Sequence, residues 1–98
     1  MIRVVLPAPL RTLAAVNGEI QVSVNGTATP RTILDAVEAM FPVLLGTIRD
    51  RKSGQRRPFI RFFVGMTDFS LEGIDVSLPA TVESGSEPFI VIGAIAGG

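Results

Sequence analysis

Hydrophobic and polar residues follow one another in short segments, and each segment predicts one element of secondary structure. Residues 2–6 are rich in β-branched side chains and suit a buried strand, and Pro7 ends its pairing because proline cannot donate to a sheet. In residues 20–24 an isoleucine and two valines alternate with polar residues, which is the period of a half-buried strand. The turn signal Asn17-Gly18 lies between them, so the two segments predict an antiparallel hairpin.

The next segment has the pattern of one amphipathic helix. Thr29 is placed to cap it, Pro30 suits its first turn and Pro42 stops it. The apolar positions that fall on one side of this helix are Ile33, Leu34, Val37 and Phe41. Asp35 and Glu38 then lie on the opposite side, where we expect them to face water.

Two further strands are expected at residues 59–65 and 89–92, each preceded by a proline suited to a strand start. Between them, residues 69–71 and 74–78 predict short pieces of irregular or extended structure. The order strand, strand, helix, strand, short pieces, strand predicts an α+β fold in which one main helix packs across a mixed sheet. This is the β-grasp pattern of ubiquitin-like domains. We expect one such domain over residues 1–93.

Alternation along residues 59–64 assigns side chains to the two faces of the sheet. Phe59, Arg61 and Phe63 fall on one face, and the face that carries Arg61 is expected to point outward. An exposed apolar face seldom lacks a use, so these three residues are predicted to bind a partner protein. The alternative is that Phe63 lies in the core.

The composition excludes most catalytic chemistry. The chain has no His, Cys, Tyr or Trp, so the usual general base, the thiol nucleophile and the soft metal ligands are all missing. Asp35 and Glu38 could be taken as paired carboxylates, but no second cluster completes a site with them. We therefore expect a protein that is not an enzyme, and that binds no metal and no cofactor of its own.

Charge is distributed unevenly although the formal net charge is zero. The nine basic residues all lie at or before Arg61, and most of them lie around residues 49–57, which have no apolar periodicity and predict a mobile loop. Neutral net charge and the lack of interleaved aromatic residues argue against a nucleic-acid site. A solvated loop and a docking loop for an acidic partner remain the alternatives. Without an apolar run long enough for a membrane span or a signal peptide, we expect no membrane contact and a cytoplasmic protein.

The sequence ends in an apolar strand followed by Ala94-Ile95-Ala96-Gly97-Gly98. Glycine has no Cβ, so a flexible tail of residues 94–98 could lie extended in a narrow channel and bring the carboxylate of Gly98 to another protein's reactive groups. Five extended residues reach about 17 Å. The alternative is an end that merely frays.

Three segments together carry a family resemblance: residues 10–14 after the first strand, residues 29–42 as the helix, and the terminal Gly97-Gly98. They resemble the MoaD/ThiS family of ubiquitin-like sulfur carriers. The resemblance implies that an E1-like adenylating enzyme uses ATP to activate Gly98, that a sulfur donor protein helps convert it to a thiocarboxylate, and that an acceptor synthase takes the sulfur for molybdopterin, thiamine or cysteine biosynthesis.

The same resemblance implies that residues 94–96 contact the partner enzymes beside Gly97 and Gly98. The basic segment 49–57 makes the chain similar to the carriers that work with a cysteine synthase. Two other classes of function stay open: a ubiquitin-like modifier joined to other proteins through Gly98, and a plain β-grasp interaction domain.

Overall fold

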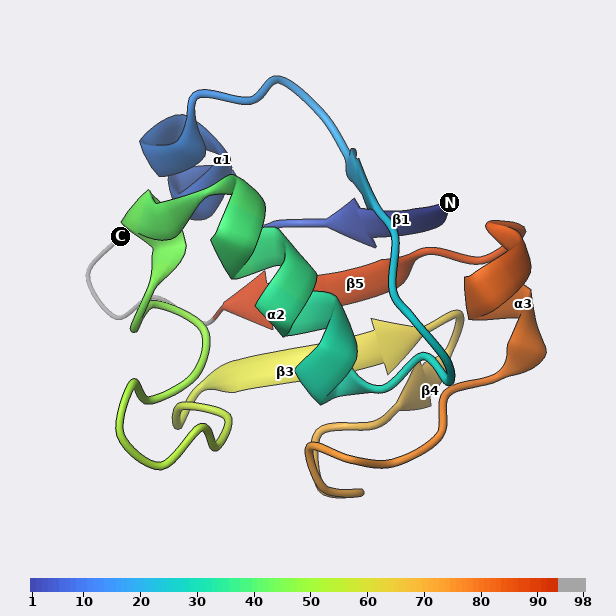
Figure 1. The fold of residues 1–98 in the computed structure, drawn as a ribbon. Helices are drawn as coiled ribbons and strands as arrows, with labels where there is room; N and C mark the ends of the chain where they lie inside the picture. The colour runs from blue at the N-terminus through green and yellow to red at the C-terminus, as the bar shows by residue number, and fades with distance from the viewer. Residues whose placement is uncertain (94–98) are drawn as a thin grey trace.

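The computed structural model describes residues 1–93, which form a five-stranded mixed sheet with one long helix across it (Figure 1). The predicted tail, residues 94–98, lies outside the described residues. The strands are β1 (Ile2–Val5), β2 (Ile20–Val22), β3 (Ile60–Val64), β4 (Thr67–Asp68) and β5 (Phe89–Gly93), in the spatial order β2-β1-β5-β3-β4. The central pair β1 and β5 is parallel, and the other pairs are antiparallel. The predicted α+β architecture is confirmed.

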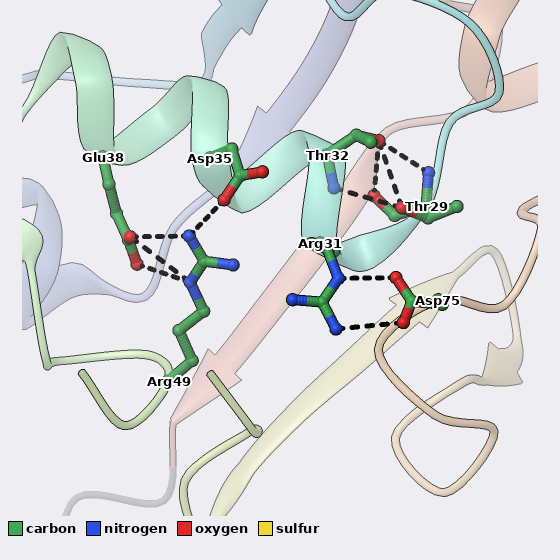
Figure 2. Close-up of polar contacts among 7 residues, drawn as sticks. All are labelled: Thr29, Arg31, Thr32, Asp35, Glu38, Arg49 and Asp75. Atoms are coloured by element: carbon green, nitrogen blue, oxygen red, sulfur yellow. Dashed lines mark hydrogen bonds and ion pairs between the residues drawn. The ribbon is translucent and has the colours of Figure 1, made fainter. Parts of the chain in front are cut away.

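Helix α2 (Pro30–Met40) covers one face of the sheet (Figure 1). Its start is fixed as the sequence predicts: the Oγ1 atom of Thr29 accepts from the Thr32 N–H at 3.1 Å, and the Thr32 Oγ1 atom accepts from the Thr29 N–H at 2.9 Å (Figure 2). These two bonds satisfy amide groups that have no partner within the helix. The helix turns its apolar stripe, including Ile33 and Val37, into the core, and Pro42 begins a short 3₁₀ helix, η1 (Pro42–Leu44).

The core lies between α2 and the covered face of the sheet. Alternate residues of the central strands enter it, so that Phe62 of β3 and Phe89 of β5 pack with ring centroids 5.1 Å apart. A tilted pair at this distance is a favourable aromatic contact. The largest fully buried side chains are Phe62, Phe89, Leu6, Ile33, Leu34, Leu44 and Ile48.

The first two strands pair as predicted, with Ile2 opposite Val22, but they are not a tight hairpin. A short helix, α1 (Ala8–Ala14), lies between them and was missed. Pro7 ends the strand, as expected, and Pro7 and Pro9 also suit the start of a helix, where a missing N–H costs nothing. The buried side chain of Leu10 holds α1 against the core.

Between β3 and β5, residues 69–71 and 74–78 belong to no helix or strand, in agreement with the short pieces that were expected, but two elements in this region were not predicted. The second edge strand is β4, and a short helix, α3 (Ala80–Ser84), precedes β5. Beyond β4, the buried side chain of Ser70 takes the place of a neighbouring strand's carbonyl. Its Oγ atom accepts from the Phe62 N–H of β3 at 2.8 Å. No helix in residues 1–93 is long and apolar enough to cross a membrane.

Candidate functional site

The structure brings together the end of β5, the start of β3 and the basic segment 49–57 at one end of the sheet (Figure 1). Gly93, the last described residue, pairs with Ile60 in the register of β3 and β5. Residues 94–98, which include the predicted functional Gly97 and Gly98, therefore follow directly from this end of the sheet, although they lie outside the described residues.

The open face of the sheet carries the three residues that were predicted to bind a partner. Arg61 is exposed, and Phe63 is half-buried, so its ring is not part of the core. Ile60 and Phe62 point the other way and are buried. The two faces of β3 are thus as the alternation predicts.

Phe59 lies on the same side but does not belong to the strand. It occupies the third position of a turn in which the Ile60 N–H donates to the Arg57 carbonyl at 3.2 Å, and its φ is +71°. Pro58 occupies the second position. This arrangement, proline and then a positive φ, is that of a type II turn, whose third position favours glycine or asparagine. Strand β3 therefore begins one residue later than predicted.

A hollow of about 320 Å³ opens on this face of the sheet. It is lined by Arg56, Phe59, Arg61, Leu71 and Ile92. The sequence predicted Phe59 and Arg61 as partner-binding residues and placed Arg56 in the possible docking loop 49–57, but it did not predict Leu71 or Ile92. Alternation along β5 was the available signal for Ile92, because buried Val91 puts its neighbour on the open face. Leu71 comes from the loop after β4, and nothing in the sequence places it there.

The guanidinium of Arg56 builds one wall of the hollow. Its Nη1 atom donates to the Ile60 carbonyl at 2.6 Å and to the Arg57 carbonyl at 3.2 Å, and its Nε atom donates to the Ser70 carbonyl at 3.0 Å. These acceptors are dipoles without net charge, so the positive charge of Arg56 is fixed in place and these contacts do not neutralise it.

The basic segment 49–57, which was predicted to be a loop, is organised as a hydrogen-bonded turn. Arg49 and Arg56 form an antiparallel bridge, and the carboxylate of Asp50 accepts from the Lys52 N–H at 2.9 Å and the Ser53 N–H at 2.8 Å. The hydrogen bond from Ser53, followed by that from Lys52, holds the pKa of Asp50 below its usual value. The segment therefore presents its cations from a defined backbone.

The prediction that Asp35 and Glu38 form a wet face was wrong for Glu38. Arg49 reaches back from the basic segment and pairs with both carboxylates, and Glu38 is buried beneath it (Figure 2). The hydrogen bond that Arg49 donates to Glu38 raises the pKa of Arg49 more than burial lowers it. Both carboxylates are thus paired with one guanidinium, which removes the possibility of paired catalytic acids. In the described part of the chain, no group of His, Cys, Asp or Glu side chains is arranged to hold a metal ion.

No family model and no curated protein matches the chain. Solved structures do match it over nearly its whole length. SAMP1 from Haloferax volcanii superposes with a TM-score of 0.74 at 21% identity, over 98% of this chain and 97% of that one. A chain of the Amycolatopsis orientalis BexX/CysO complex matches with a TM-score of 0.75 at 21% identity, over the full length of both chains.

The fold is the ubiquitin-like β-grasp fold. Mycobacterium tuberculosis CysO gives the same result, with a TM-score of 0.75 at 18% identity over 97% of this chain and all of that one. Agreement across complete chains shows that the order of elements, with one main helix against a mixed sheet, is the β-grasp arrangement itself. At this level of identity the likeness shows the fold alone.

Proposed function

We propose that this β-grasp protein is a sulfur carrier that works in the cytoplasm as a co-substrate of other enzymes. The carboxylate of Gly98 is activated by an E1-like adenylating enzyme with ATP and is converted to a thiocarboxylate, with a sulfur donor protein supplying the sulfur. An acceptor synthase then takes the sulfur. Residues 94–98 enter the partner's active site, and the folded domain remains outside it.

One observation carries the proposal. The last strand of the β-grasp domain, β5, ends at Gly93, and five more residues follow it, of which the last two are Gly97 and Gly98. A segment that short, ending in two residues without side chains, suits a narrow channel. The domain itself offers no nucleophile or general base of the usual kinds, since His and Cys are absent from the sequence. The chemistry therefore has to be supplied by partners.

Of the three sulfur pathways, the proposal favours cysteine biosynthesis. Two of the structural neighbours carry the name CysO, and the basic segment 49–57 resembles that of carriers that work with a cysteine synthase. The Amycolatopsis orientalis structure is a BexX/CysO complex, so a domain of this fold can be crystallised with a partner protein.

Intact mass spectrometry of the protein purified from its native cells tests the proposal. Replacement of one terminal oxygen by sulfur raises the mass by the difference between the two atoms, and the increase must map to the C-terminal peptide. Treatment with a thiol-alkylating reagent should label that peptide alone, because the chain has no cysteine. A matched control is protein from cells that lack the adenylating enzyme, which should show only the unmodified mass. The unmodified mass in both samples would contradict the proposal.

A second function is favoured by one comparison. Two of the matching structures are of a Haloferax volcanii protein known as SAMP1, or small archaeal modifier protein 1. A modifier would be joined to a lysine of another protein and would be recovered in a larger covalent product. Because Lys52 is the one lysine of this sequence, products that link copies of this chain through a lysine must use it. Conjugates that persist under denaturing conditions would favour the modifier, and recovery of the free carrier after sulfur transfer would favour the first proposal.

A further inference from the structure

We propose that the hollow on the open face of the sheet docks an apolar side chain that is flanked by carboxylates on a partner protein, and that Phe59 is the anchor of this contact. The partner is the adenylating enzyme that receives residues 94–98, so this inference rests on the proposed function. It adds the chemistry of the contact surface and identifies a residue whose conformation serves binding at the expense of stability.

The backbone of Phe59 supplies the first observation. Its φ of +71° places a bulky residue where an L-amino acid is strained, at a turn position that glycine or asparagine occupies more easily. Strain of this kind persists where the surrounding structure imposes it, and it concentrates at functional positions. Pro58 and the hydrogen bond from Ile60 to Arg57 impose it here.

The side chain of Phe59 supplies the second observation. It is 72% exposed, so the folded monomer gains little from burying it. Leu71, on another wall of the hollow, is 83% exposed, and Ile92 is also exposed. Three large apolar side chains that come from different parts of the sequence thus surround one concave surface without covering it. Such a surface is typical of a site that another protein fills.

Charge around the hollow selects the kind of partner. Arg56 is held by three backbone carbonyls and pairs with no carboxylate of residues 1–93, while Arg61 pairs with Asp68 at 3.0 Å. Two guanidinium groups against one carboxylate leave a positive surplus at the rim. A partner surface that combines an apolar side chain with carboxylates is complementary to it, and a basic surface would be repelled.

The position of the hollow connects it to the enzyme that acts on Gly98. Ile92 lines the hollow and Gly93 follows it, and Gly93 lies opposite Ile60, the residue after Phe59. A protein that binds the residues directly after Gly93 must therefore come close to Phe59 in space. The hollow is in place to receive a side chain from the rim of that protein's channel.

The test compares Phe59→Gly and Phe59→Asn with the unmodified chain, using the E1-like enzyme of the same organism and ATP–pyrophosphate exchange as the readout. Both variants relieve the strained turn and remove the anchor. We expect the KM for the carrier to rise about tenfold or more with little change in kcat, because docking is lost and the reacting carboxylate is not touched. The midpoint of thermal unfolding should stay the same or rise by a few degrees. Met66→Ala is the control, because Met66 is 98% exposed in the turn at the other end of β3, and it should change neither quantity.

Opposite movements of binding and stability would support the inference, because a structural residue would lose both together. An unchanged KM in both Phe59 variants would overturn it. A fall of more than about 5 °C in the unfolding midpoint of both variants would overturn it as well, since Phe59 would then stabilise the fold. Absence of exchange with the unmodified chain would instead contradict the proposed function itself, and with it the partner assigned to this surface.

Discussion

Arg49 and Glu38 form a two-pronged ion pair that fastens the basic segment to α2. The Arg49 Nη2 atom lies 2.8 Å from the Glu38 Oε1 atom, and its Nε atom lies 3.1 Å from Oε2 (Figure 2). The two side chains are only 11% and 9% exposed. Because both charged groups are shielded from water, each is stabilised mainly by the other. The pair therefore links the basic segment before β3 to helix α2.

Removal of Arg49 is expected to be costly. Arg49→Met leaves Glu38 buried without a counter-charge, which should lower the free energy of unfolding by about 3 kcal/mol. The double variant Arg49→Met with Glu38→Leu should recover most of this loss, because neither charge then remains. Urea titration measures both. As a control, Arg3→Gln breaks the more exposed pair with Glu19 and should lower the free energy of unfolding clearly less than Arg49→Met does. Equal losses in Arg49→Met and Arg3→Gln would contradict the assignment.

Phe62 and Phe63 are neighbours in the sequence with opposite environments. Phe62→Ala should lower the free energy of unfolding by about 3–5 kcal/mol, because a fully buried ring that packs on Phe89 is lost. Phe63→Ala should cost clearly less, because its ring is only partly buried on the open face. Thermal or denaturant unfolding of the two variants checks this order, and a larger loss for Phe63→Ala would mean that the two faces are reversed.

Acid should weaken the basic segment through Asp50. Its pKa is lower in the folded protein than its usual value of 3.8, so the folded state binds the proton less readily than the unfolded state. The stabilisation is therefore complete above the unfolded pKa and is lost as the pH falls through the folded pKa. Asp50→Asn keeps the Oδ1 acceptor and removes the titration, so unfolding measured as the pH falls from about 5 to about 2 should show a shallower decline. Asp50→Ala, which removes the acceptor too, should already be less stable at neutral pH.

The exposed cations of the basic segment are expected to act on the rate of association. Arg51 and Lys52 are exposed, and within residues 1–93 no carboxylate pairs with their side chains. The double variant Arg51→Gln with Lys52→Gln should therefore slow association with the adenylating enzyme at low salt. The rate of dissociation should stay nearly unchanged. Arg56 is unsuitable for this test because its guanidinium supports the backbone at Ile60 and Ser70. Stopped-flow binding across a salt series decides it. A rate that does not respond to salt in the unmodified protein would leave the segment a structural turn only.

The terminal glycines should matter for transfer and not for folding. Deletion of Gly98, or addition of one residue after it, should abolish adenylation, because the activated carboxylate is lost or displaced. Gly97→Val should fail as well, since a β-branched side chain restricts the backbone and fills a narrow channel. The buried apolar side chains of the described residues end at Val91, so the unfolding midpoint should not change. Normal pyrophosphate exchange with any of these variants would contradict the proposed function.

Local patterns in the sequence determined the main elements. The cap at Thr29, the apolar stripe and the stop at Pro42 predicted α2 to within a residue, and alternation predicted the two faces of β3. These signals need only the geometry of a helix or a strand, because each depends on residues a few positions apart. The expectation that the protein is not an enzyme also needs no tertiary structure, because it depends on the residue types alone, and it stays a prediction.

Contacts between distant residues decided the rest. The helical pattern predicts that Glu38 faces solvent. In the structure Arg49, eleven positions later in the sequence, covers it and pairs with it. Alternation predicts that Phe59 is a strand residue, whereas the turn from Arg57 to Ile60 gives it a positive φ. The hollow beside Phe59 forms only because the fold brings in Leu71 and Ile92 from other parts of the chain. The spacing of hydrophobic residues along the sequence indicates which side of its own helix or strand a residue occupies. Which charges and loops cover that side is set by packing in three dimensions, and only the tertiary structure shows it.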